Sequence, residues 1–294
     1  MIPESILMLA IVAYIHKKIR FYFVLKKAKN KKYVIKEGAE PYLIKKGKIG
    51  VLFIHGFTSS PQEGKGLANY LASKDITVYA PLLKGHGTKV EDLARTRKED
   101  WEESALQAFD KLASLVDKIY IAGSSVGGNL ALRISTKRKV NGIISMGTPM
   151  FFRREKYARI AIPLNLIFRS FIKKKFDEKE KEIIKHKIHY DSFPLNCLPS
   201  GIKLVKLSGK DLPKITAPIL IMQSKTDKVL AIENIDFIYN KISSKIKKKV
   251  IIPDSYHVFL IDKYKEDAFK EIYSFIKEIE ELNEKPILTT PIKV

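Results

Sequence analysis

From residue 42 onward, short apolar runs alternate with longer amphipathic stretches. The short runs are rich in β-branched residues and have the length of buried parallel strands. They predict strands at 49–54, 76–80, 118–122, 142–146, 218–223 and 249–253. Between them, apolar side chains recur every three or four residues, which predicts helices that include 67–73, 101–116, 130–135 and 266–282. This alternation predicts an α/β fold, a mostly parallel sheet with helices on both faces.

The alternation stops after Pro149. Residues 151–212 are basic, have a helical pattern and are poor in strand signals. We therefore expect a core made of residues 42–150 and 213–282, with residues 151–212 inserted as a helical cap over one edge of the sheet. Residues 283–294 form an irregular tail.

Residues 1–41 form a separate hydrophobic and basic segment. An apolar run at 6–15 is about half the length of a membrane-spanning helix, and His16, Lys17 and Lys18 follow it directly. A cleaved secretory signal fits poorly, because its basic residues should precede the apolar run. A short anchor, an interfacial segment on anionic headgroups and a helix packed on the core remain open, and the membrane interpretations are favoured. Since the positive flank follows the apolar run, we expect a cytoplasmic protein attached to the inner face of the membrane.

The chain has 294 residues, 45% of them apolar, which excludes wholesale disorder and a polytopic membrane protein. Its net charge of +22 is concentrated in two blocks, with +9 in residues 1–50 and +9 in 151–214. Neither block has a nucleic-acid recognition motif, so we expect no nucleic-acid partner, and we expect the N-terminal segment and the cap to face an anionic membrane surface instead. The single cysteine, Cys197, cannot form an internal disulfide, which favours a reducing compartment. No histidine has metal-ligand spacing with other ligands, so no metal or cofactor is expected.

A possible nucleophile follows the strand predicted at 118–122. The sequence Gly123-Ser124-Ser125-Val126-Gly127 matches G-x-S-x-G with Ser125 at its centre. A tight turn between a strand and a helix strains this central residue and exposes its hydroxyl above the sheet edge. Because the motif lies between a clear strand and a clear helix, it predicts that Ser125 is a catalytic nucleophile.

A serine nucleophile needs a base that is oriented by an acid, and in this type of fold both follow the serine in the chain. Asp227 follows the strand predicted at 218–223, and His257 follows the strand at 249–253. We expect His257 to be the general base and Asp227 the acid. Asp254 is a rival on the same loop as His257, but it is close in sequence for orienting that side chain.

Two backbone amides are candidates for an oxyanion hole. The Val126 N–H follows the nucleophile, and the Phe57 N–H follows Gly56 in the loop after the first predicted strand. His55 precedes this glycine and His86 lies between two glycines. We interpret both histidines as architectural rather than catalytic.

These motifs, VLFIHGFTSSP, VYAPLLKGHGT, IAGSSVGG, MGTPM and the loops of Asp227 and His257, resemble the small bacterial carboxylesterases and monoacylglycerol lipases of the α/β-hydrolase superfamily. The similarity covers roughly residues 42–280. The resemblance implies that Ser125 attacks an ester carbonyl, that His257 transfers the proton and that Asp227 orients it. It also implies that the Phe57 and Val126 amides stabilise the oxyanion and that the cap lines the substrate pocket.

We therefore expect a serine esterase for short or medium acyl esters or monoacylglycerols that works through an acyl-enzyme. Within catalysis, a lysophospholipase or thioesterase at an anionic membrane is the alternative, and a non-catalytic membrane-bound scaffold is the rival from another class. The apolar cap residues could form an acyl-binding wall or the cap's own core: Phe151, Phe152, Ile160, Ile162, Leu164, Leu166, Ile167 and Phe168.

Overall fold

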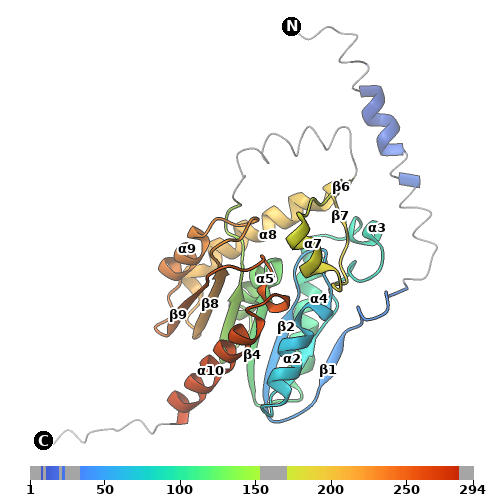
Figure 1. The fold of residues 1–294 in the computed structure, drawn as a ribbon. Coiled ribbons are helices and arrows are strands. Elements are labelled where there is room, and N and C mark those ends of the chain that lie inside the picture. Colours follow the sequence, from blue (N-terminus) through green and yellow to red (C-terminus); the bar gives the residue numbers. More distant parts are fainter. Residues whose placement is uncertain (1–7, 9–10, 20–21, 24–33, 153–170, 285–294) are drawn as a thin grey trace, which may run out of the picture.

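The protein is built around one mostly parallel sheet, seen in a computed structural model that describes residues 8, 11–19, 22–23, 34–152 and 171–284 (Figure 1). The strand order is β1-β3-β2-β4-β5-β8-β9. β1 pairs antiparallel with β3, and every other neighbouring pair in this sheet is parallel. The strands are β1 (Tyr42–Ile44), β2 (Ile49–Ile54), β3 (Thr77–Ala80), β4 (Lys118–Ser124), β5 (Gly142–Met146), β8 (Ile219–Ser224) and β9 (Lys247–Ile252).

Helices cover both faces of the sheet, because the central strands are apolar on both sides. In β2, Val51 and Phe53 belong to a hydrophobic cluster shared with α2 and α10, whereas Leu52 and Ile54 belong to a second cluster shared with α4, α5 and α9. The helices of the core are α2 (Lys65–Ala72), α3 (Val90–Leu93), α4 (Lys98–Ala113), α5 (Val126–Ser135), α9 (Glu233–Lys241) and α10 (Lys265–Glu284), with 3₁₀ turns η1 (Pro61–Gly64) and η4 (Phe259–Ile261).

The predicted α/β architecture is confirmed, and each predicted strand begins and ends within two residues of an observed one. The sequence did not predict β1, which has three half-buried residues at the edge of the sheet and therefore carries little apolar signal.

The cap needs one correction. Besides helix α7 (Glu178–Ile184) it contains an antiparallel pair, β6 (Phe171–Lys173) and β7 (Ser192–Pro194), where the sequence predicted only helices. These strands have three residues each, which is too short for a periodic pattern to appear. The chain returns through η2 (Leu195–Cys197), α8 (Leu198–Asp211) and η3 (Leu212–Lys214), and Leu204 of α8 belongs to the same hydrophobic cluster as α4 and α5.

The described part of the N-terminal segment is helical at residues 11–19. Its large apolar side chains are about half exposed: Ile11, Val12, Ile15 and Ile19 retain 50 to 55% of their accessible surface. Within the residues that the structure describes, no helix is long and apolar enough to cross a membrane.

Candidate active site

The candidate nucleophile lies at the turn between β4 and α5. Ser125 has φ 52° and ψ −120°, a left-handed conformation that non-glycine residues rarely adopt. Its backbone N–H donates a hydrogen bond to the carbonyl of Met146 at 2.8 Å, so the turn is tied to the end of β5. The side chain is half-buried and retains access to solvent. This is the strained, accessible serine that the G-x-S-x-G motif predicts.

The flanking glycines are required by the close approach of three backbone segments. A Cβ on Gly127 would lie 2.1 Å from the carbonyl oxygen of Ile54 in β2, and a Cβ on Gly123 would lie 2.2 Å from the carbonyl oxygen of Gly127. Both distances are far below van der Waals contact. The turn therefore packs directly on β2, which brings Ser125 beside the loop that follows this strand.

That loop carries the first candidate oxyanion donor. A Cβ on Gly56 would lie 3.4 Å from the Cβ of Ser125, so the loop passes in contact with the nucleophile. The next residue, Phe57, offers its backbone N–H. The second candidate, Val126, is the first residue of α5, and N–H groups in the first turn of a helix have no acceptor within the helix. Both amides thus come from segments adjacent to Ser125.

His55 fixes the direction of the Phe57 amide. The Nε2 atom of His55 accepts a hydrogen bond from the Leu83 N–H at 3.2 Å, so Nδ1 carries the proton and donates to the Gly56 carbonyl at 2.9 Å. The Gly56 carbonyl and the Phe57 N–H belong to one planar peptide unit, so holding the first orients the second. The predicted architectural role of His55 is confirmed by these two hydrogen bonds.

The acid and base candidates meet at the carboxyl ends of β8 and β9. The Nδ1 atom of His257 donates to Oδ2 of Asp227 at 2.6 Å, and the other oxygen of Asp227 accepts from the N–H groups of Val229 and Leu230 at 2.7 and 2.9 Å. Burial alone would raise the pKa of Asp227, but the neighbouring imidazole and these amides hold it below its ordinary value. An ionised Asp227 keeps the proton on Nδ1 and leaves Nε2 free to accept one.

Asp254 does not take part in this arrangement. Its carboxylate is half-exposed and pairs with Lys263 at 2.7 Å and with Lys179 at 3.5 Å. The structure therefore brings Asp227, and not the rival on the histidine loop, to His257.

The imidazole of His257 lies over the end of β5, next to the strand that carries the serine. Gly147 has φ 53°, and a Cβ there would lie 3.4 Å from Cε1 of His257. The preceding residue, Met146, accepts the hydrogen bond from Ser125. The three candidate side chains thus follow the ends of β4, β8 and β9 and lie at one edge of the sheet, where open α/β sheets place their sites.

A group of charged residues beside this site was not predicted from the sequence. Glu63 is 2% exposed and pairs with Lys187 of the cap at 2.7 Å, and Lys174 of the cap donates a hydrogen bond to the hydroxyl of Thr58. The three charged residues belong to no motif, and the two partners of each contact lie more than 100 positions apart in the chain. The only signal in the sequence is a lysine-rich cap, which resembles an ordinary solvated surface.

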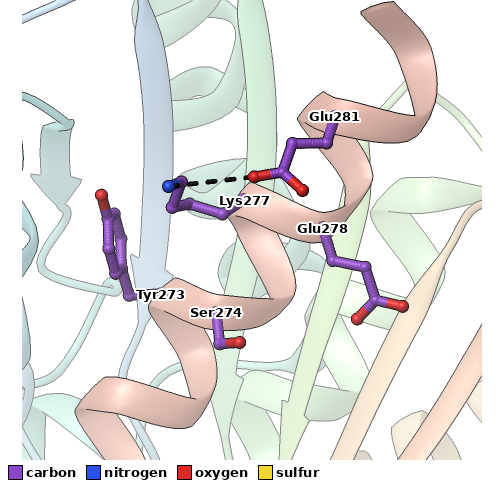
Figure 2. Close-up of a pocket in the computed structure, with 5 residues that line it drawn as sticks. All are labelled: Tyr273, Ser274, Lys277, Glu278 and Glu281. Atoms are coloured by element: carbon purple, nitrogen blue, oxygen red, sulfur yellow. Dashed lines mark ion pairs between the residues drawn. The ribbon is translucent and has the colours of Figure 1, made fainter. Parts of the chain in front are cut away.

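Two other features lie outside the site. Six of the apolar cap residues considered for an acyl-binding wall, from Ile160 to Phe168, are outside the described residues. A depression on the outer face of α10 is lined by side chains from this helix alone, including the Lys277–Glu281 pair at 3.8 Å (Figure 2). It contains no member of the candidate site, and we assign it no role.

The sheet, the strained serine turn and the histidine–carboxylate pair together define a serine hydrolase of the α/β-hydrolase class. Residues 45–264 match the family model described as Hydrolase_4, serine aminopeptidase S33, and the chain belongs to this family. The resemblance to carboxylesterases and monoacylglycerol lipases is thereby confirmed by two curated relatives.

The first relative is a carboxylesterase of Bacillus subtilis (strain 168), 26% identical over 82% of this chain and 97% of its own length. The second is a thermostable monoacylglycerol lipase of Bacillus sp. (strain H-257), 30% identical over 79% of this chain and 92% of its own length. Among solved structures, one of the metagenome-derived lipolytic enzymes LipS and LipT is 28% identical with a TM-score of 0.76, covering 83% of this chain and all of that one. The monoacylglycerol lipase of Paleococcus ferrophilus, at 18% identity and a TM-score of 0.67 over 82% and 99% of the two chains, shares the fold.

Proposed function

We propose that Ser125, His257 and Asp227 form the catalytic triad of a carboxylic ester hydrolase. Ser125 Oγ attacks the ester carbonyl while Nε2 of His257 accepts its proton, and ionised Asp227 stabilises the resulting imidazolium. The N–H groups of Phe57 and Val126 donate to the oxyanion of the tetrahedral intermediate. The imidazolium then returns the proton to the leaving alcohol, which gives an acyl-enzyme that water hydrolyses by the same steps.

The observation that carries this proposal is the hydrogen bond of 2.6 Å from His257 Nδ1 to the buried carboxylate of Asp227. Because Nδ1 is engaged with Asp227, Nε2 is the ring nitrogen that can accept the proton of Ser125. The imidazole ring lies next to the end of β5, to which the Ser125 turn is also bonded.

The substrate class rests on the relatives. One is a carboxylesterase and the other a monoacylglycerol lipase, and each is matched over more than nine-tenths of its length. We therefore propose short or medium acyl esters or monoacylglycerols as substrates of this chain.

The triad is tested by hydrolysis of p-nitrophenyl esters of increasing acyl length. Ser125→Ala is expected to lower kcat/KM by at least about 10³-fold, because it removes the nucleophile. Labelling by a fluorophosphonate is expected to disappear in Ser125→Ala and to slow strongly in His257→Ala. Ser135→Ala at the end of α5 is the matched control and should retain both the ester hydrolysis and the fluorophosphonate labelling of the wild type. Equal rates for the wild type and Ser125→Ala would refute the assignment.

We also propose that the N-terminal helix attaches the protein to the inner face of an anionic membrane. The helix at 11–19 exposes Ile11, Ile15 and Ile19 while Lys17 and Lys18 lie in its last turn. Exposed apolar side chains next to lysines are the combination that places a helix in the headgroup region, where apolar burial and charge attraction add together.

This attachment is tested by sedimentation with vesicles of phosphatidylglycerol and phosphatidylcholine. The full chain is expected to pellet with them, more weakly as salt is raised, since salt screens the lysine contribution. Deletion of residues 1–25 is expected to abolish pelleting while leaving hydrolysis of a water-soluble ester unchanged. If the deleted form pellets as well as the full chain, the N-terminal helix is not the membrane contact.

A further inference from the structure

One part of the cap runs directly along the loop that carries the Phe57 amide. We define the cap strap as residues 171–191 and the oxyanion loop as residues 56–63. The strap and the loop are joined by four hydrogen bonds of 2.7 to 3.0 Å, from Tyr190 N to Thr58 O, from Ser60 Oγ to Ile188 O, from Ile188 N to Gln62 Oε1 and from Gln62 Nε2 to His186 O. The loop is therefore held from the cap side along most of its length.

The loop needs such a restraint because one of its residues is strained. Thr58 has φ 64° and is 2% exposed. A β-branched residue in the left-handed region is a genuine outlier, and it persists only where the surroundings hold it. Thr58 immediately follows Phe57, so relaxation of its backbone would move the candidate oxyanion donor.

Lys174 of the strap acts on the side chain of this strained residue. Its amino group donates a hydrogen bond to Oγ1 of Thr58. The Thr58 hydroxyl directs its own hydrogen away from this donor and donates to the carbonyl of Phe57 at 2.5 Å. That carbonyl belongs to the peptide unit after Phe57, whereas His55 holds the peptide unit before it. Both peptide planes that flank Phe57 are thus fixed, one from the core and one from the cap.

A buried ion pair also joins the cap strap to the oxyanion loop. The Oε2 atom of Glu63 accepts from Lys187 Nζ at 2.7 Å and from Ser59 Oγ at 2.5 Å. Burial alone would raise the pKa of Glu63, but Lys187 and neighbouring hydroxyls lower it to about 2. The carboxylate therefore remains charged and keeps the strap against the loop.

We propose that the cap strap is part of the oxyanion-hole machinery and that Lys174 is the positioning residue that holds the Phe57 amide through Thr58. This inference rests on the proposed function, in which the Phe57 N–H stabilises the oxyanion. Lys174 contacts neither the ester nor the triad in this role. It acts through the hydroxyl of Thr58.

The environment of Lys174 supports a role other than stabilising the fold. Burial and the nearby Lys187 lower the pKa of Lys174 to about 7. An amine whose charged form is disfavoured by its surroundings costs the folded state free energy at neutral pH. Its removal should therefore leave stability unchanged or increased, whereas a residue with only a structural role would destabilise the protein when removed.

The first test compares Lys174→Met, Lys174→Arg and the matched control Lys173→Met, which changes an exposed lysine on the same strand. With p-nitrophenyl butyrate, Lys174→Met is expected to lower kcat at least 10-fold with KM changed less than twofold and with an unchanged or higher melting temperature. Lys174→Arg should recover most of kcat because it retains a donor, and the control should match the wild type. An increase in KM alone would indicate that Lys174 binds the substrate. An unchanged kcat would show that Lys174 does not position the Phe57 amide. Either result overturns the proposal.

The second test asks whether Lys174 acts through Thr58. Glycine adopts a positive φ without strain, so Thr58→Gly removes the need for the restraint. In a Thr58→Gly background, Lys174→Met is expected to change kcat less than twofold. In the wild-type background, Lys174→Met is expected to lower the affinity for a trifluoromethyl ketone by the same factor by which it lowers kcat/KM. An equal loss in both backgrounds would refute the proposed route. If Ser125-dependent hydrolysis is absent altogether, the proposed function fails; if it is present and Lys174→Met equals the wild type, only the positioning role fails.

Discussion

Two buried imidazoles stand behind the Phe57 amide. The rings of His55 and His86 are 0 and 1% exposed, and their centroids are 5.0 Å apart. Burial lowers the pKa of His55 to about 4, and burial together with the neighbouring His55 lowers the pKa of His86 well below its ordinary value. Both rings are therefore neutral at neutral pH, which suits a structural role beside the proposed base, His257.

These two histidines predict a loss of stability in mild acid. In the unfolded chain they titrate near pH 6.5, so below this pH the unfolded chain binds protons that the native state does not bind. Their stabilising contribution is complete above pH 6.5 and declines as the pH falls below it, for His55 until about pH 4. Each group contributes a slope of about 1.4 kcal/mol per pH unit in this window.

The measurement is urea unfolding at pH 8, 6 and 5. His86→Asn keeps a donor for the Lys84 carbonyl, which Nδ1 of His86 approaches at 3.2 Å, and removes one titrating group. Its stability should fall less steeply with pH than that of the wild type, whereas His186→Asn at an exposed position should preserve the wild-type slope. Parallel curves for the wild type and His86→Asn would contradict the prediction.

The predictability of the site differs from residue to residue. The structure brings the candidates Ser125, Asp227 and His257 to one edge of the sheet, as the sequence predicted, because each lies in the loop or turn after a predicted strand and the carboxyl ends of parallel strands meet there. Lys174 and Lys187 could not be predicted, because their partners Thr58 and Glu63 lie far away in the sequence, in the part of the core that precedes the cap. Only the folded path of the cap brings them together.

At the scale of elements, the turn between β4 and α5 depends on glycine for contact between backbones. Gly127→Ala is expected to destabilise the protein by about 3 kcal/mol or more, because its Cβ would overlap the Ile54 carbonyl and push α5 away from β2. Gly201 in α8 is the matched control, since a Cβ there meets nothing within 4 Å. Gly201→Ala should stabilise by about 0.5 to 1 kcal/mol through helix propensity. Denaturant midpoints measure both, and equal midpoints for the two variants would contradict this account of the turn.

Most of the strands that the sequence predicted are buried over several residues; β9, in which only Ile252 is buried, is an exception. The central strands β2, β4 and β5 are buried almost throughout, so they appear as continuous apolar runs. In contrast, β6 and β7 have three residues each and are only partly buried. Neither strand has a periodic pattern of its own, and the bonds to the oxyanion loop come from residues beside them, such as Lys174 and Tyr190.

At the scale of the whole molecule, the structure changes the meaning of the charge count. Part of the excess charge of residues 151–214 does not face solvent, since Lys187 is 9% exposed and Lys174 is bonded to the core. Toward the C-terminus, Lys248 and Lys249 of the edge strand β9 pair with Glu271 and Asp236, each at 2.5 Å. We therefore assign the proposed attachment to an anionic membrane to the exposed N-terminal helix, and the vesicle experiment with residues 1–25 deleted tests this assignment.

The order of strands in the sheet has a consequence for the time at which the protein acquires activity during its synthesis. β4, which presents the serine, lies near the middle of the sheet, whereas β8 and β9, which present Asp227 and His257, are its last two strands. The ribosome adds 132 residues between Ser125 and His257, which takes about 7 to 26 s at typical rates of synthesis. A nascent chain thus holds Ser125 without the proposed base throughout this interval, and we expect hydrolytic activity to arise only after the final strand joins the sheet.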